Sequence, residues 1–195
     1  MTDNLHNIRA PKDILKETET FRTPFASFTA LLDYAPEWFA SGVGFDPAAG
    51  DGRMIKEIVR RGNKGPHILG DIRDERISWA GVPATSSVGD FLSQKCPPFD
   101  FLITNPPFSL AQRFVEHSLP NAGGRVCILQ SVAFQGTAKR SRWLVESGLR
   151  YVLNLPTRPK WEVDSGSRVF SNVWDFAWFI FEPGYRELPE MDWLL

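Results

Sequence analysis

Cysteine and histidine are scarce in this sequence, with two Cys and three His among 195 residues. Cys96 and Cys127 are too few and too far apart for a disulfide framework or a zinc site, so we expect two buried thiols in a reducing compartment. His6, His67 and His117 lack the spacing of metal ligands and are expected to be structural or surface residues. These shortages argue against a disulfide-stabilised secreted module and against a metal centre.

Long apolar runs and a strong net charge are missing as well. No run approaches the roughly 20 residues of a membrane helix, and the first residues lack the basic-then-apolar pattern of a secretory signal. The net charge is −1, so overall electrostatics do not point to a nucleic-acid partner. A hydrophobic content of 43% and a charged content of 23% are ordinary for a globular domain. We expect a cytoplasmic protein without a membrane partner, with a polar tail over residues 1–20 and one domain over residues 21–195.

Strand-like and helix-like segments alternate from residue 21 onward. Short apolar runs predict strands and segments with helical apolar spacing predict helices. The alternation predicts an α/β fold with a doubly wound, mostly parallel sheet that is covered on both faces and ends in an antiparallel pair. Strands are expected at 43–46, 67–71, 83–88, 99–104, 125–131, 151–155 and 173–181, and helices at 24–39, 53–61, 109–118 and 136–147.

The most informative stretch is Asn105-Pro106-Pro107-Phe108, which follows the apolar run 99–104. Two prolines fix φ and supply no N–H, so the strand must stop there in a rigid corner. Such a corner suits a planar group with an exocyclic NH₂, because the Asn105 oxygen and the Pro106 carbonyl can each accept one N–H while the Phe108 ring lies on the planar face. The alternative is a simple Pro-Pro turn between strand and helix.

A second turn, Asp46-Pro47-Ala48-Ala49-Gly50-Asp51-Gly52, leaves the first expected strand. Its small residues let the backbone approach a ligand closely, and its glycines permit a tight turn. The turn lacks both the Gly-Lys-Ser/Thr ending of a P-loop and the G-x-G-x-x-G dinucleotide pattern. Because aspartates flank it, the turn suits a cationic ligand better than a pyrophosphate.

Aspartates also end the second and third expected strands. Asp71 lies about 20 residues after the first turn, where a carboxylate can accept both hydroxyls of a ribose. Asp90 can accept from an adenine amino group beside the Phe91 ring. Either aspartate alone is as easily a cap of its turn. Together with the turn at 46–52 they fit an adenosine that carries a positive charge.

These segments, in this order and spacing, resemble the class I S-adenosylmethionine-dependent methyltransferases, and among them the Asn-Pro-Pro-Phe/Tyr enzymes that are chiefly DNA adenine-N6 methyltransferases. The resemblance covers roughly residues 21–181. It implies a Rossmann-like seven-stranded sheet with a C-terminal antiparallel hairpin, and S-adenosyl-L-methionine as the cofactor. It also implies a wall near the methionine part of the cofactor formed by Phe21 and Thr23. The cofactor-binding residues are then expected to be Phe21, Thr23, Asp46, Pro47, Ala48, Gly50, Gly52, Asp71, Ile72, Asp90, Phe91 and Asn105, and the catalytic residues Asn105, Pro106, Pro107 and Phe108.

The reaction implied is methyl transfer to the exocyclic N6 of adenine in DNA. Hydrogen bonds from the amine to Asn105 and to the Pro106 carbonyl favour a tetrahedral nitrogen whose lone pair faces the methyl group. Phe108 is expected to stack on the base, which in a duplex has to be flipped out of the helix. No catalytic histidine is evident.

A local excess of positive charge between 139 and 168 can follow a phosphate backbone, although a solvated basic face is the plain alternative. The chain has no room for a separate target-recognition region, so we expect low sequence specificity, a homodimer or a separate specificity subunit, as in a phage or prophage enzyme. RNA remains a possible partner. Open alternatives are an amine or amide of RNA or protein (a ribosomal RNA base or a glutamine) as the acceptor, and a non-catalytic cofactor-binding subunit. The expected nucleic-acid-binding residues are Lys139, Arg140, Arg142, Arg158, Lys160 and Arg168.

Overall fold

An eight-stranded mixed sheet forms the centre of the protein in the computed structural model, which describes residues 21–163, 169–171 and 174–195. Its strand order is β11-β7-β10-β6-β5-β2-β3-β4. The predicted fold class is confirmed, because β2 to β6 run parallel and β10 lies antiparallel between β6 and β7. The strands are β2 (Gly44–Asp46), β3 (His67–Asp71), β4 (Ala84–Val88), β5 (Phe99–Thr104), β6 (Ala122–Ser131), β7 (Leu149–Asn154), β10 (Phe176–Phe181) and β11 (Glu190–Trp193).

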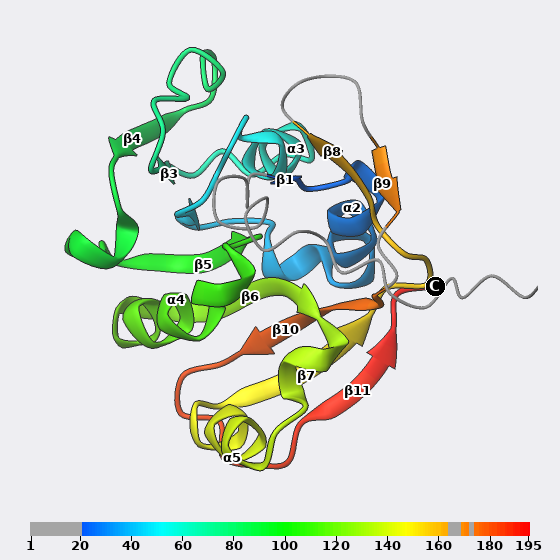
Figure 1. The fold of residues 1–195 in the computed structure, drawn as a ribbon. Coiled ribbons are helices and arrows are strands. Elements are labelled where there is room, and N and C mark those ends of the chain that lie inside the picture. The colour runs from blue at the N-terminus through cyan, green and yellow to red at the C-terminus, as the bar shows by residue number, and fades with distance from the viewer. Residues whose placement is uncertain (1–20, 164–168, 172–173) are drawn as a thin grey trace, which may run out of the picture.

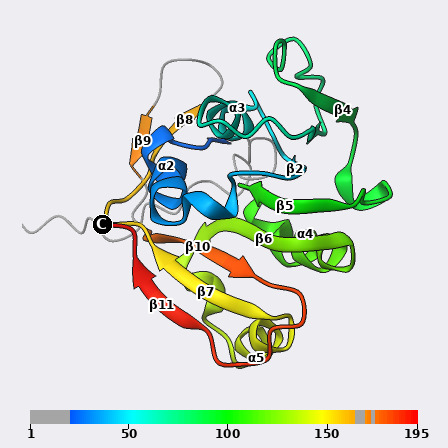
Figure 2. The same cartoon turned by 180° about the vertical axis from the view of Figure 1, so that it is seen from behind.

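Helices cover both faces of this sheet (Figures 1 and 2). Apolar residues of α2 (Phe25–Tyr34) and α3 (Arg53–Arg60) form one core with one face, and those of α4 (Ala111–Ser118) and α5 (Ala138–Glu146) form a second core with the other. Five short 3₁₀ turns complete the described helical structure: η1 (Pro36–Trp38), η2 (Phe91–Ser93), η3 (Phe108–Leu110), η4 (Leu119–Asn121) and η5 (Val132–Gln135).

The first helix is shorter than the sequence predicts. Its apolar spacing continues to Phe39, but α2 ends at Tyr34 and η1 follows. Proline explains the break, because Pro36 has no N–H to donate and its ring disfavours helical geometry at the residue before it.

Two parts of the fold were not expected from the sequence. The first is β11, an eighth strand that pairs in parallel with β7 and lies at the sheet edge. The second is the short strand β1 (Phe21–Arg22), which pairs antiparallel with β8 (Lys160–Val163) of the hairpin that β8 forms with β9 (Val169–Ser171). These strands have two to four residues each, so none carries a readable alternation of apolar and polar residues.

Three further expectations concern the cysteines, membrane-spanning helices and the N-terminal segment. Cys96 and Cys127 are free and buried, as predicted. Within the described residues, no helix has the length and apolarity needed to cross a bilayer. The expected tail at 1–20 lies outside the part of the chain that the structure describes.

Candidate functional site

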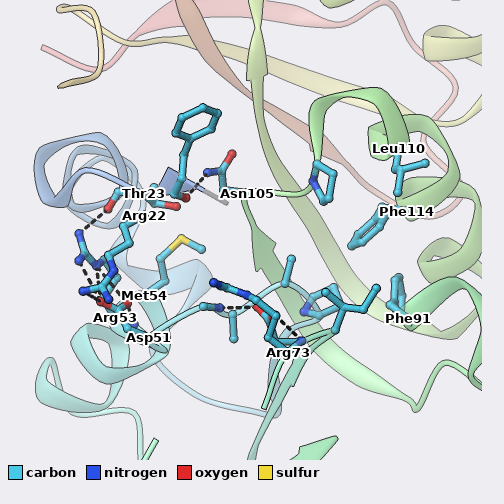
Figure 3. Close-up of a pocket in the computed structure, with 18 of the residues that line it drawn as sticks. Arg22, Thr23, Asp51, Arg53, Met54, Arg73, Phe91, Asn105, Leu110 and Phe114 are labelled. Carbon is cyan, nitrogen blue, oxygen red and sulfur yellow. Dashed lines mark hydrogen bonds and ion pairs between the residues drawn. The ribbon is translucent and has the colours of Figure 1, made fainter. Parts of the chain in front are cut away.

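A pocket opens at the carboxyl edge of the sheet, where the loops after β2, β3, β4 and β5 meet (Figure 3). It contains about 820 Å³ of space, part of it open to solvent. This is the position at which ligands bind in open α/β sheets. The predicted cofactor residues on its wall are Phe21, Thr23, Pro47, Ala48, Gly50, Asp71, Ile72, Asp90, Phe91 and Asn105.

Asp46 and Gly52 are the two predicted cofactor residues that do not reach the pocket wall. Asp46 is fully buried behind the turn, where its Oδ1 accepts the Ala48 N–H at 3.1 Å and its Oδ2 has no hydrogen-bond partner. Burial raises the pKa of this carboxyl to about 7. Gly52 adopts a φ of +74°, and a Cβ there would lie 2.8 Å from the Trp79 ring. Glycine at position 52 therefore serves the shape of the turn.

Asp71 joins the turn after β2 to the loop after β3. Its Oδ2 accepts the Gly50 N–H at 2.9 Å, and its Oδ1 accepts the Arg73 N–H at 2.9 Å. Arg73 Nε also donates to Oδ1, at 3.4 Å. A carboxylate offers about four acceptor positions, so Asp71 keeps about one position for a hydroxyl of a ligand. The predicted acceptor is thus already oriented on the pocket wall by the backbone.

Asp90 both caps a turn and lines the pocket, so the cap is confirmed and the bond to an adenine amine stays a prediction. Its carboxylate accepts from Leu92 N–H at 3.0 Å and from Ser93 Oγ at 2.8 Å, and these bonds, Ser93 foremost, lower its pKa. The Phe91 ring beside it is buried, whereas the Ile72 side chain on the same pocket is 70% exposed. An exposed isoleucine beside a carboxylate is a suitable surface for an apolar ring.

Several pocket residues were missed by sequence reasoning. Figure 3 shows Arg22, Asp51 and Arg53 together on one side of the pocket and Leu110 and Phe114 on the other. Arg53 donates to Asp51 at 2.9 Å and to the Thr23 carbonyl at 3.1 Å. Asp51 belongs to the turn at 46–52, whereas the other four residues carry no motif. For Arg22 and Arg53 the only signal was their position beside Thr23 and Gly52.

The charge expected at the turn after β2 is largely neutralised. Asp51 forms ion pairs with Arg53 at 2.9 Å and with Arg22 at 3.6 Å. Burial raises the pKa of Asp51, but the hydrogen bonds and charge of Arg53 outweigh it and the pKa is lowered overall. The prediction that the flanking aspartates suit a cationic ligand therefore finds no free carboxylate to support it, since Asp51 is paired and Asp46 is buried.

The corner after β5 presents Asn105 and Pro107 to the pocket, while Pro106 is buried and lies off the wall. Asn105 Nδ2 donates to the Phe21 carbonyl at 3.4 Å, and its Oδ1 is buried without a hydrogen-bond partner. A buried, unpaired acceptor is costly, so it marks a place where a ligand donor is expected. Asn105 therefore contributes to the pocket wall a side-chain amide whose Oδ1 has no partner among the described residues and whose Nδ2 has a second N–H besides the one bonded to Phe21.

Phe108 does not line the pocket. Its ring packs among Phe21, Trp161 and Phe176 at centroid distances of 6.5, 5.9 and 5.4 Å, and the Phe21 ring is nearly parallel to it at 17°. Such contacts hold the corner in place. They also occupy much of the surface on which the sequence predicts a base to stack.

The predicted nucleic-acid-binding residues fall into two separate groups. Lys139, Arg140 and Arg142 belong to α5, and Figures 1 and 2 show α5 and β8 at opposite ends of the molecule. Arg140 lies 4.3 Å over the Phe134 ring. The structure thus does not gather α5 with the pocket.

The second basic group lies closer to the pocket. Lys160 is exposed on β8, whose neighbour β1 contributes to the pocket wall, and Arg158 forms an ion pair with Asp175 at 2.9 Å. Arg168 lies outside the described residues.

Comparison with known proteins identifies the fold. No protein-family model matches the sequence, and no curated protein matches it either. Among solved structures, the chain is similar to a Pyrococcus horikoshii protein described as a candidate RNA methyltransferase, with a TM-score of 0.65, 19% identity and 90% of each chain covered. It is also similar to a ribosomal protein L11 methylase from Lactobacillus delbrueckii, with a TM-score of 0.54, 14% identity, and 79% and 77% coverage. A dimethyladenosine transferase from Plasmodium falciparum has a TM-score of 0.53 and 15% identity, with 80% and 60% coverage. The chain thus has the fold found in these methyltransferases.

The buried Asp46 carboxyl generates a pH prediction. Its folded-state pKa of about 7 lies above the ordinary value of 3.8, so its ionisation opposes folding. The preference of the folded state for the neutral Asp46 carboxyl contributes stability that is complete below about pH 4 and is lost as the pH rises through 7. Asp46→Asn keeps the acceptor for the Ala48 N–H and removes the ionisation. We expect the free energy of unfolding of the variant, relative to wild type, to rise between pH 4 and 8. Urea unfolding across this range measures it, and a constant difference would contradict the assignment.

Proposed function

We propose that this protein is an S-adenosyl-L-methionine-dependent N-methyltransferase that acts on the exocyclic N6 amine of adenine in DNA. The observation that carries this proposal is the buried, unpaired Oδ1 of Asn105, a residue on the wall of the pocket at the carboxyl edge of the sheet. An acceptor in that position is suited to a substrate that brings an N–H donor. The fold supports the proposal, because the solved structures it resembles include several methyltransferases.

The residues of the pocket fit the cofactor. Asp71 has an acceptor position left for a ribose hydroxyl, and Ile72 and Phe91 offer apolar surface for the adenine. Asp90 is an acceptor for the adenine amine. Arg22, beside Phe21 and Thr23, supplies positive charge for the methionine carboxylate.

The cofactor would supply an electrophilic methyl group on a positively charged sulfur. The chain then has to position the nucleophile, which is poor because its lone pair is delocalised into the ring. Asn105 Oδ1 accepts one N6 hydrogen, which favours a tetrahedral nitrogen with its lone pair toward the methyl group. The Pro106 carbonyl has no such part in this proposal, because Pro106 is buried and lies off the pocket wall. Alignment of this kind can supply several kcal/mol of the barrier. The packed ring of Phe108 keeps Asn105 at the required place.

The acceptor is proposed to reach the site along β8 rather than α5. Lys160 is exposed on the strand that pairs with β1, and β1 provides Phe21 and Arg22 to the pocket. Contacts between lysine and phosphate position a nucleic acid without reading its sequence. The proposal therefore includes low sequence specificity, or a second subunit that supplies it, and a cytoplasmic enzyme of bacterial or phage origin.

An amine or amide of RNA or protein is the second candidate acceptor. It is favoured by the descriptions of the fold relatives, which include RNA and ribosomal-protein methylation. Incubation of the protein with labelled cofactor and duplex DNA, single-stranded DNA, RNA or protein extract separates the candidates. Label transferred only to RNA or protein would replace DNA as the proposed acceptor.

Asn105→Ala tests the catalytic corner. We expect methyl transfer to fall at least 100-fold, because the amine loses the acceptor that orients it, while calorimetry shows cofactor affinity within about threefold of wild type. Asn154→Ala is the matched control, since Asn154 lies on β7 with its Nδ2 bonded to the Asp192 carbonyl and does not line the pocket. Wild-type turnover in Asn105→Ala would refute the proposed mechanism.

Asp71→Ala tests the cofactor site. The substitution removes the proposed ribose acceptor and frees the Gly50 N–H, so we expect the Kd for S-adenosylhomocysteine to rise at least tenfold. Asp33→Ala removes an exposed carboxylate paired with Arg61 and should leave this Kd unchanged. Calorimetric titration of both variants gives the comparison; equal Kd values would place the ligand elsewhere.

Charge reversal tests the route of the nucleic acid. Lys160→Glu and Lys139→Glu make the same change in net charge at the two separate basic groups. We expect Lys160→Glu to raise the Kd for DNA several-fold and to reduce the salt dependence of binding by about one phosphate contact, with little effect from Lys139→Glu. Fluorescence anisotropy at several salt concentrations measures both, and the reverse ranking would move the binding surface to α5.

A further inference from the structure

Trp79 lies in the connection between β3 and β4 and contacts the turn after β2. Residues 72–83 form a series of hydrogen-bonded turns and no helix. Individual side chains of these turns, rather than a helix, therefore cover the sheet beside β3. Trp79 is buried, and its Nε1–H donates to the Gly50 carbonyl at 2.8 Å. A buried indole N–H needs a partner, and here the partner is the backbone of the turn that lines the pocket.

The peptide groups of Gly50 are therefore held from two directions. Its N–H is bound by Asp71 Oδ2 at 2.9 Å and its C=O by Trp79 Nε1 at 2.8 Å. Gly50 has a φ of +51°, and a Cβ added there would meet nothing within 4 Å, in keeping with its place on the pocket wall. The open side of Gly50 faces the pocket only while the backbone of the turn keeps this conformation.

Gly52 shows the same contact from the other end of the turn. A Cβ at Gly52 would lie 2.8 Å from Trp79 Cδ1 and 3.3 Å from Trp79 Nε1. The indole thus lies directly against the turn at Gly52, and the same Cβ would lie 3.6 Å from Leu69 Cδ1. Trp79 does not line the pocket, so any influence on a ligand passes through the turn.

We propose that Trp79 is a positioning residue for cofactor binding: its hydrogen bond to Gly50 and its contact with Gly52 hold the turn at 46–52 in the ligand-binding shape. This inference rests on the proposed function, because it assigns the pocket to S-adenosyl-L-methionine. Asp71 binds the Gly50 N–H and Trp79 binds the Gly50 C=O. Loss of either side chain therefore allows one of the two peptide groups of Gly50 to rotate.

Trp79→Phe removes the N–H and keeps an aromatic ring against Gly52. We expect the Kd for S-adenosylhomocysteine to rise about three- to tenfold, the range of one lost hydrogen bond. The kcat for methyl transfer at saturating cofactor should stay within about twofold of wild type, because Asn105 and its corner are unchanged.

Trp178→Phe is the matched control. Trp178 is also buried, and its Nε1–H also donates to a backbone carbonyl at 2.8 Å, that of Ser27, but neither residue lines the pocket. Its substitution should lower the melting temperature and leave the Kd for S-adenosylhomocysteine unchanged. A merely structural role for Trp79 predicts the same Kd for S-adenosylhomocysteine in Trp79→Phe and in Trp178→Phe. The inference would be overturned if neither variant changed this Kd, or if both raised it equally.

Hydrogen exchange supplies a readout that does not need the cofactor. The Gly50 N–H is bonded to Asp71 and the Gly52 N–H to the Ala49 carbonyl at 2.8 Å. Both amides should exchange faster in Trp79→Phe than in wild type and at the wild-type rate in Trp178→Phe. If the wild-type protein binds no cofactor, the proposed function fails, and the exchange rates still decide whether Trp79 holds the turn. Unchanged rates in Trp79→Phe would overturn that role.

Discussion

The hydrogen bond between Asp71 and the Gly50 N–H ties together the first two loops at the carboxyl edge of the sheet. Parallel strands place these loops side by side, but loops alone do not form a pocket with a fixed wall. Because β2 and β3 are paired in register from Gly44 and His67 onward, Asp71 emerges next to the turn that leaves β2. One carboxylate therefore sets the backbone of the turn and keeps acceptor positions free. The rest of the site is arranged around this contact.

A second set of contacts joins the pocket to the catalytic corner through the short strand β1. The Phe21 carbonyl accepts from Asn105, Arg22 pairs with Asp51, and the Thr23 carbonyl accepts from Arg53. The same strand pairs with β8, whose Trp161 packs on Phe21. Two residues of β1 thus connect the corner after β5, the turn after β2 and the segment between β7 and β10. A shift of any of these three segments would therefore change the position of the Asn105 side-chain amide.

The sequence was sufficient for the fold class and for most of the pocket because their signals are local. Buried strands such as β10 are continuous apolar runs, and the turns after β2 and β5 contain glycine and proline, which restrict the backbone in known ways. The sequence was insufficient where residues act through partners distant in the chain. Arg22, Trp79 and Phe114 carry no motif, and each gains its place only when strands and helices have packed. Phe108 shows the same limit, since its position was predicted while its packing among three other rings was not.

The charges around the pocket have a consequence for the proposed reaction. Asp51 is paired with two arginines and Asp46 is buried with its pKa near 7, so neither places a free carboxylate beside the turn. The positive charge of the methyl donor disappears as the methyl group leaves. A carboxylate against that charge would therefore stabilise the ground state more than the transition state and slow the transfer. In the proposed function the pocket recognises the ribose and the adenine through Asp71, Ile72 and Asp90, and among the described residues the turn brings no unpaired carboxylate to the sulfur, which avoids this cost. The affinity for the cofactor would then come from its nucleoside part and from its carboxylate beside Arg22, and the reactivity of the methyl group would be preserved.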